Sequence, residues 1–114
     1  MKISNLSETT NKGDVICTVT EYPTHWEEMN MAAVKLCVRH PASGFRTNTK
    51  VKEACLVTKG GGKITKSDGQ TFSFQKGDIV YIEVGDKYFW DAKCELVIAC
   101  TPRWTPEQSE FTQH

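Results

Sequence analysis

Short runs in which apolar and polar side chains alternate recur along the chain, separated by clusters of Gly, Asp, Asn and Pro. In one run, Val80 and Ile82 alternate with Tyr81 and Glu83, which is the two-residue period of an extended segment. Helical periodicity is scarce. The pattern predicts eight strands, near residues 14–20, 30–39, 53–58, 63–66, 70–74, 79–82, 87–91 and 95–101. Short strands at this spacing predict an all-β sandwich or barrel.

Glycine-containing stretches mark the expected turns. Asp68-Gly69 predicts a two-residue hairpin with a type I′ turn, and Gly85-Asp86 predicts a second turn. The run 60–62 is Gly-Gly-Gly, which follows an apolar strand and predicts that the chain turns sharply there.

Length and charge limit the classes of protein that the sequence can encode. A chain of 114 residues predicts one domain with a single core. The 14 basic and 14 acidic residues are spread without blocks, so neither a nucleic acid nor an anionic membrane is an expected partner. No apolar run approaches the roughly 18 residues of a membrane span, and the first 14 residues lack the apolar segment of a signal peptide. We therefore expect a cytoplasmic protein.

The five cysteines are odd in number, contain no CxxC pair and lie in apolar stretches. A free cysteine in such a stretch usually behaves as a small apolar side chain. We predict reduced thiols in the core or in pocket walls, and no disulfide framework.

The spacing of residues 77–92 resembles a known sequence motif. Gly77, Glu83, Gly85, Tyr88 and Ala92 are separated by five, one, two and three residues. These intervals are those of the second motif of the cupin superfamily, in which the five positions hold Gly, Pro, Gly, His and Asn. Both glycines fit, whereas the proline, the histidine and the asparagine are replaced.

The second half of the first cupin motif is similar to residues 53–60, where six residues separate Glu53 from Gly60. The histidine half is absent. Counting back from Glu53 reaches either Thr47 and Thr49 or Arg46 and Asn48. The strand phrases between the motifs and the ending 94–108 are also similar to small single-domain cupins.

The resemblance implies a double-stranded β-helix, the cupin jelly roll barrel, in which two antiparallel sheets surround a pocket. It implies one cupin domain over residues 1–114, with the motif-bearing barrel at about 30–105 and an N-terminal strand and a C-terminal tail packed on it. By analogy with other single cupin domains, we expect a homodimer.

Cupins that perform chemistry usually hold Fe, Mn, Ni, Cu or Zn with three histidines and one glutamate. Of these four positions, the chain keeps only Glu53, and its three histidines, His25, His40 and His114, lie outside the motif. We therefore expect neither a metal site nor another cofactor.

The resemblance implies that Glu53 and Tyr88 point into the barrel, and strand alternation places Trp90 on the face of Tyr88. A carboxyl group beside a phenol in an apolar pocket would have a raised pKa and could act as acid or base. Alternatively, the two residues contact a ligand without catalysis. Arg46 is a candidate for binding an anionic substituent of a ligand; alternatively, it is a solvated residue of a loop. Asn48 is a candidate for a polar contact with the ligand.

Three functions remain open at this stage. The first is binding of a small organic ligand, a sugar or another metabolite, without a transition metal. The second is a metal-independent isomerase, epimerase or lyase acting on a sugar through Glu53 and Tyr88. The third is a metalloenzyme with unorthodox ligands. The site expected for the first comprises Arg46, Asn48, Glu53, Tyr88 and Trp90.

Overall fold

The computed structural model describes residues 1–13 and 17–114. Apart from two 3₁₀ turns, η1 (Leu6–Glu8) and η2 (Pro106–Gln108), the regular structure is β-strand. The strands are β1 (Thr10–Gly13), β2 (Cys17–Tyr22), β3 (Asn30–Leu36), β4 (Arg39–His40), β5 (Phe45–Asn48), β6 (Lys52–Lys66), β7 (Thr71–Gln75), β8 (Ile79–Ile82), β9 (Lys87–Thr101) and β10 (Ser109–Thr112). Among the described residues, no helix is long and apolar enough to cross a membrane.

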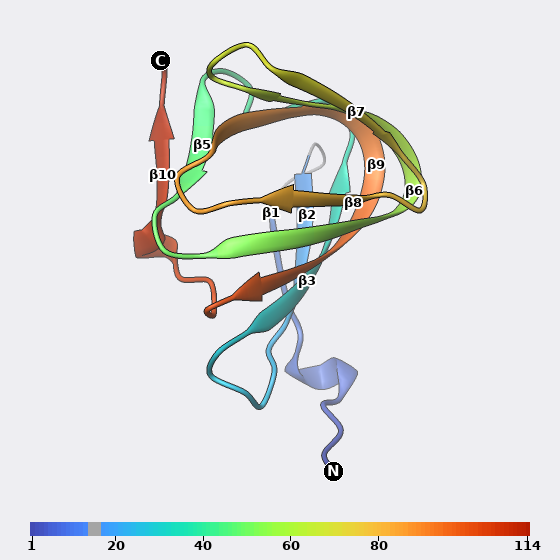
Figure 1. Ribbon diagram of the computed structural model, residues 1–114. Helices are drawn as coiled ribbons and strands as arrows, with labels where there is room; N and C mark the ends of the chain where they lie inside the picture. The colour runs from blue at the N-terminus through green and yellow to red at the C-terminus, as the bar shows by residue number, and fades with distance from the viewer. Residues whose placement is uncertain (14–16) are drawn as a thin grey trace.

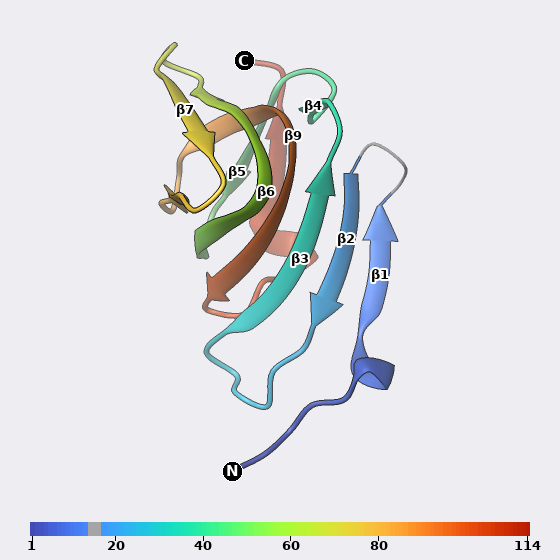
Figure 2. The same cartoon turned by 90° about the vertical axis from the view of Figure 1, so that its right-hand side faces the viewer.

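One strongly curled antiparallel sheet makes up the fold (Figures 1 and 2). The 15-residue strands β6 and β9 pair along almost their whole length, from Lys52 with Thr101 to Lys66 with Tyr88. One half of β9 also pairs with β3, which continues the sheet to β2 and β1. The other half pairs with β4 and β5, and β5 pairs with β10. The predicted all-β architecture is confirmed.

Two predicted strand boundaries inside β6 and β9 are wrong. Segments 53–58 and 63–66 form one strand, and the chain does not turn sharply at Gly60–Gly62. A β-bulge lies between Val57 and Lys59, and Gly60 has a φ of +73°, so the strand bends without ending. A Cβ at Gly62 would lie 2.5 Å from the Cα of Ala92, which shows that these glycines permit close contact with neighbouring backbone. Segments 87–91 and 95–101 are likewise one strand, β9.

The predicted strand 30–39 ends at Leu36, and Arg39 and His40 form the separate β4. This break lets the chain follow the curl of β9, because Leu36 pairs with Cys94 and Arg39 pairs with Asp91. Residues 14–16 of the predicted strand 14–20 lie outside the described residues. The prediction missed the short strands β1, β5 and β10.

The hairpin between β6 and β7 is present, but its turn is not type I′. No residue other than glycine has a positive φ among the described residues, so Asp68 cannot occupy that turn. Instead, the Gly69 N–H donates to the Lys66 carbonyl at 2.9 Å, and Gly69 has a φ of +91°. The Lys66 N–H donates to the Gln70 carbonyl, and the Asp68 side chain accepts from the Gln70 N–H. This is the pattern of a type I turn followed by a glycine bulge.

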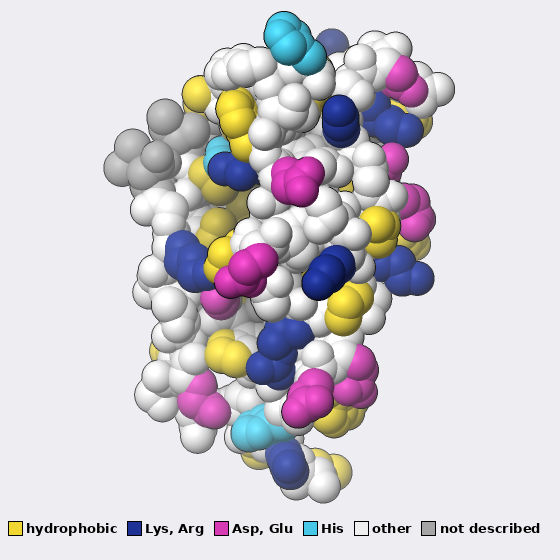
Figure 3. Space-filling view, turned by 90° about the vertical axis from the view of Figure 1, so that its left-hand side faces the viewer, with side chains coloured by type: hydrophobic (Ala, Val, Ile, Leu, Met, Phe, Trp, Pro, Cys, Tyr) yellow, Lys and Arg dark blue, Asp and Glu magenta, His cyan; other side chains and the backbone are white. Residues whose placement is uncertain are grey.

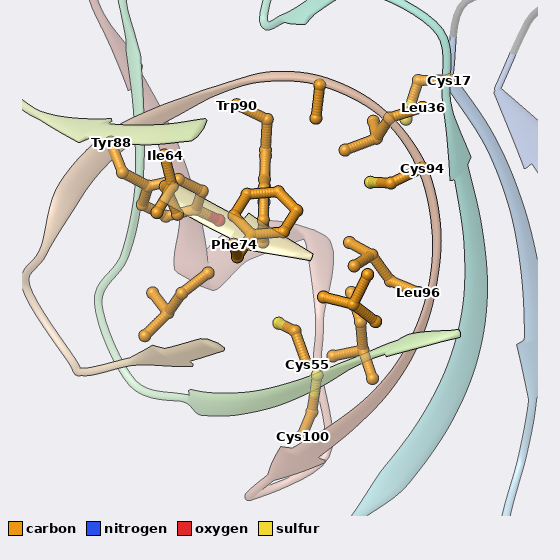
Figure 4. Packing of buried hydrophobic residues seen from close by; sticks show 14 residues of the cluster. Cys17, Leu36, Cys55, Ile64, Phe74, Tyr88, Trp90, Cys94, Leu96 and Cys100 are labelled. Atoms are coloured by element: carbon orange, nitrogen blue, oxygen red, sulfur yellow. The ribbon is translucent and has the colours of Figure 1, made fainter. Parts of the chain in front are cut away.

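The core lies inside the curl, where alternate residues of β9 point inward (Figure 4). These buried residues are Tyr88, Trp90, Ala92, Cys94, Leu96, Ile98 and Cys100. They pack against inward-facing side chains of β6 and β7, including Cys55, Val57 and Phe74. The five cysteines are thiols rather than disulfides, and four of them are buried.

Candidate functional site

A cavity of about 410 Å³ opens between two parts of the curled sheet. One wall comes from β1, β2, β3 and the second half of β9, and the other comes from β4, β5 and the first half of β9. The C-terminal tail adds Trp104, Pro106 and Ser109 to the lining. The face that carries β5 and β10 shows a recess in which hydrophobic side chains lie beside charged ones (Figure 3).

All five predicted site residues, Arg46, Asn48, Glu53, Tyr88 and Trp90, line this cavity. Cross-strand pairing brings them together, because Arg46 lies opposite Tyr88 and β6 carries Glu53 opposite Cys100. The structure also distinguishes the two residue pairs that could occupy the histidine positions of the first motif. The pair that lines the cavity is Arg46 and Asn48, whereas the intervening Thr47 does not.

Glu53 has the environment of a carboxyl group that resists ionisation. Burial raises the pKa of Glu53 above its ordinary value of 4.5. The thiol of Cys100 donates to Oε1 at 3.4 Å and opposes this rise in pKa. The Asn48 amide also opposes the rise, although it does not meet the geometry of a hydrogen bond to Glu53. Burial is the largest effect, so protonated Glu53 persists to higher pH than an exposed glutamate.

Tyr88 and Trp90 form an aromatic wall. Their ring centroids are 6.2 Å apart at 87°, and Phe74 lies 5.5 Å from Trp90 at 89°, so Trp90 is held edge-on by two rings. Burial, followed by the nearby charge of Glu53, raises the pKa of Tyr88 well above 10. Arg46 opposes that shift. Tyr88 therefore keeps its O–H proton and can donate it in a hydrogen bond.

Asn48 is fixed by the tail of the chain. Its Oδ1 accepts from Nε2 of Gln108 at 3.0 Å. The Oε1 of Gln108 in turn accepts from the backbone N–H groups of Val51 and Lys50. Asn48 is only 2% exposed, and among the described residues its Nδ2 has no partner that meets hydrogen-bond geometry.

Several lining residues were not predicted: Lys12, Glu21, Asn30, His40 and Trp104. Lys12 forms an ion pair with Glu21 at 3.0 Å and lies 5.2 Å from the centre of the Trp104 ring. Asn30 Oδ1 accepts from the Trp104 backbone N–H at 3.0 Å. These residues belong to β1–β4 and the tail, outside both motifs. Strand alternation could have indicated only which face each one occupies.

A second hollow of about 420 Å³ lies at the other edge of the curl, between β7 and β8. Tyr88 lines both hollows. The charged groups Lys66 and Asp86 of this second hollow are already paired at 3.4 Å. The cavity of about 410 Å³, which Arg46, Asn48 and Glu53 line together with Tyr88, is therefore the better candidate site.

The residues at the four family ligand positions do not fit a transition metal. A guanidinium stands at position 46, and it is a cation without a free electron pair. Asn48 offers a weak amide donor, and Tyr88 keeps its proton because its pKa is raised. Within residues 1–13 and 17–114, no group of three or more His, Cys, Asp or Glu side chains is placed to hold a metal ion.

Residues 35–97 match the family described as the EutQ-like cupin domain, and this match covers more than half of the chain. The resemblance seen in the motifs is thereby confirmed. No curated protein matches the sequence.

Among solved structures, the chain is similar to Pac13 from Streptomyces, which is described as a nucleoside dehydratase and has also been solved with uridine. The TM-score is 0.85 at 12% identity, and the match covers 99% of this chain and 92% of Pac13. Ectoine synthase from P. lautus has a TM-score of 0.74 at 14% identity, covering 96% and 88%. The polyketide cyclase RemF from Streptomyces resistomycificus has a TM-score of 0.73 at 11% identity, covering 98% and 85%. At such identities the likeness shows the fold alone.

Proposed function

Because the chain belongs to the EutQ-like cupin domain family, and because its metal positions hold unsuitable donors, we propose that it binds a small organic ligand without a transition metal. The ligand is a sugar, a nucleoside or a metabolite of similar size. One observation carries the proposal: Asn48, Glu53 and Tyr88 present polar groups to a single cavity of about 410 Å³. Such a volume, with a few convergent polar groups, is typical of small-molecule sites.

The two walls of the cavity differ in character, and this difference describes the ligand. The wall from β2, β3 and the end of β9 is largely apolar, with Val19, Val34, Leu36, Leu96 and Ile98. The opposite wall is polar and aromatic. A ligand with one flat apolar face and one polar edge would satisfy both walls. Pac13, which shares the fold, has been solved with uridine, and uridine has this character.

Tryptophan emission tests the proposal. Trp90 and Trp104 line the cavity, whereas Trp26 does not and is exposed. We expect at least one compound in a panel of nucleosides, including uridine, and of hexoses and sugar acids to change the emission saturably. Glu53→Ala should lower the binding free energy by about 1 to 3 kcal/mol, the cost of an unpaired buried polar contact.

Glu110→Ala, on an exposed position of β10, is the matched control and should bind as the unmodified protein does. The proposal fails if no compound in the panel changes the emission. It also fails if Glu53→Ala and Glu110→Ala bind equally well.

A second function, a metal-independent lyase, is favoured by the juxtaposition of Glu53 and Tyr88. In a dehydration, the Glu53 carboxylate would take a proton from the carbon next to a carbonyl group. It would then return that proton to the hydroxyl leaving from the neighbouring carbon, which departs as water and leaves a carbon–carbon double bond. Tyr88, which keeps its proton, would donate a hydrogen bond to the enolate oxygen. The dehydratase described for Pac13 supports this class of reaction.

Glu53→Gln separates the two functions, because glutamine preserves the shape and the hydrogen bonds but cannot carry the proton. A lyase should lose turnover while the variant still binds the compound found in the emission screen. If turnover persists in Glu53→Gln, Glu53 is not the acid or base.

A further inference from the structure

The guanidinium of Arg46 is a cation in the cavity that the protein does not use for itself. The other two arginines, Arg39 and Arg103, each donate to two backbone carbonyl groups. The Arg46 guanidinium, by contrast, has neither a hydrogen bond nor an ion pair within the described part of the chain. It lies 5.7 Å from the centre of the Phe111 ring. Its five N–H donors are therefore available to a bound molecule.

Asn48, two residues further along β5, offers a second unused donor. The hydrogen bonds of Gln108 determine the orientation of both side-chain amides. Gln108 accepts from backbone N–H groups with Oε1, so it donates to Asn48 with Nε2. Asn48 must accept that bond with Oδ1, which turns its Nδ2 away from Gln108. Buried donors in native proteins almost always have an acceptor. Among the described residues no atom meets hydrogen-bond geometry with Nδ2, although it lies close enough to the Glu53 carboxyl group to oppose the rise in its pKa. An acceptor on a ligand would complete this group.

The two donors lie on the same face of one strand and line the same cavity. Residues i and i+2 of a strand are roughly 7 Å apart, so an oxyanion between their side chains can accept from both. Lys12, a cation on the opposite wall of the cavity, already forms an ion pair with Glu21 at 3.0 Å. Arg46 therefore supplies a positive charge that forms no ion pair with the described residues of the site.

We propose that the ligand carries a carboxylate, whose two oxygens accept hydrogen bonds from the Arg46 guanidinium and from Nδ2 of Asn48. This inference rests on the proposed function, and it narrows the ligand to an acid such as a sugar acid. A phosphate has three oxygens and up to two negative charges. It would need more donors than these two. One guanidinium and one amide match a monoanionic carboxylate better.

The arrangement also orients the ligand. Tyr88 is the cross-strand neighbour of Arg46, and Glu53 lines the cavity beside them. A carboxylate held at Arg46 therefore places the first carbons of the ligand beside the proposed acid and base, with the remainder of the ligand against the apolar wall.

Titration of the ¹⁵N-labelled protein with formate and with inorganic phosphate tests the carboxylate site, with sodium chloride as the control for ionic strength. We expect formate to shift the side-chain N–H signals of Arg46 and Asn48 saturably. Arg46→Gln should weaken formate binding roughly tenfold or more, as expected for loss of a charge-assisted hydrogen bond. Lys87→Gln, which removes a cation from an exposed position of β9 next to Tyr88, should bind formate unchanged.

The same spectra show whether each variant is folded. The proposal is overturned if formate gives no saturable shift, if Arg46→Gln binds formate as well as Lys87→Gln does, or if phosphate binds more tightly than formate. Glucuronate should also bind more tightly than glucose in the tryptophan emission assay. If uridine or glucose binds there while formate does not, the proposed function stands and the carboxylate assignment fails. If neither the neutral compounds nor the acids bind, both fail.

Discussion

At the scale of single residues, the burial of Glu53 gives a pH-dependent stability. Its pKa in the folded protein is raised above the value near 4.5 that it has when unfolded. The stabilising contribution of this group is therefore complete below pH 4.5 and is lost as the pH rises through the folded pKa. Glutamine is neutral at every pH, so Glu53→Gln should gain stability relative to the unmodified protein as the pH rises above 4.5.

Chemical denaturation at a series of pH values measures this difference. Glu110→Gln, at an exposed position, controls for the loss of one carboxyl group. A difference between Glu53→Gln and the unmodified protein that stays constant across the series would contradict the burial of Glu53.

Metal content is a second property decided by single residues. A guanidinium repels a divalent cation, and Arg46 occupies one of the four positions from which related cupins ligate a metal. Protein purified without chelator should therefore carry far less than one equivalent of Fe, Mn, Ni, Cu or Zn by elemental analysis. Stoichiometric metal that disappears in Glu53→Ala would show that the donors act in an arrangement other than the one described.

The cavity residues that sequence reasoning found and those that it missed differ in how they are positioned. Glu53 and Tyr88 could be predicted because the motif glycines keep a constant spacing to them. Lys12 and Glu21 could not, because only the pairing of β3 with β9 brings the N-terminal strands to the cavity. Trp104 could not either, because it reaches the cavity from the tail through its backbone hydrogen bond to Asn30. No local pattern in residues 10–22 encodes that pairing.

At the scale of elements, glycines are required in the sheet and in its turns for two different reasons. Gly62 does not have a positive φ, but a Cβ there would lie within 2.6 Å of three atoms of β9. Gly85 has a φ of +88° and open space around its Cβ position, so only its backbone conformation disfavours a side chain. The sequence of the triplet at 60–62 predicts a turn because backbone flexibility is a local property. Its close packing involves a strand some 30 residues away, which no local pattern shows.

Substitution by alanine distinguishes these two roles. Gly85→Ala should cost about 1 to 2 kcal/mol of unfolding free energy, the penalty of a left-handed conformation for a residue with a Cβ. Gly62→Ala forces backbone apart and should cost about 3 kcal/mol or more, at the upper end of overpacking effects. Thermal and chemical unfolding measure both values. Equal costs would mean that β6 and β9 are not in close contact at Gly62.

At the scale of the whole molecule, β1 forms an edge of the sheet. Among the described strands it pairs only with β2, so its other side presents unpaired backbone groups (Figure 2). Exposed edges tend to be covered by a further strand or a second copy of the chain. We expect a homodimer, for which sedimentation should give twice the 12.8 kDa of one chain. A mass of one chain at all concentrations tested would contradict this expectation.

The pairing of β3 with β9 also determines when the fold can form. Asn30 pairs with Cys100 and Leu36 with Cys94, so β3 must await a strand from the far end of the chain. Topologies dominated by such long-range contacts fold slowly, over roughly milliseconds to seconds. During synthesis, β1, β2 and β3 leave the ribosome well before β9 does. The apolar inner face of Val19, Val34 and Leu36, which later becomes a wall of the cavity, therefore stays uncovered until the chain has been made to residue 100.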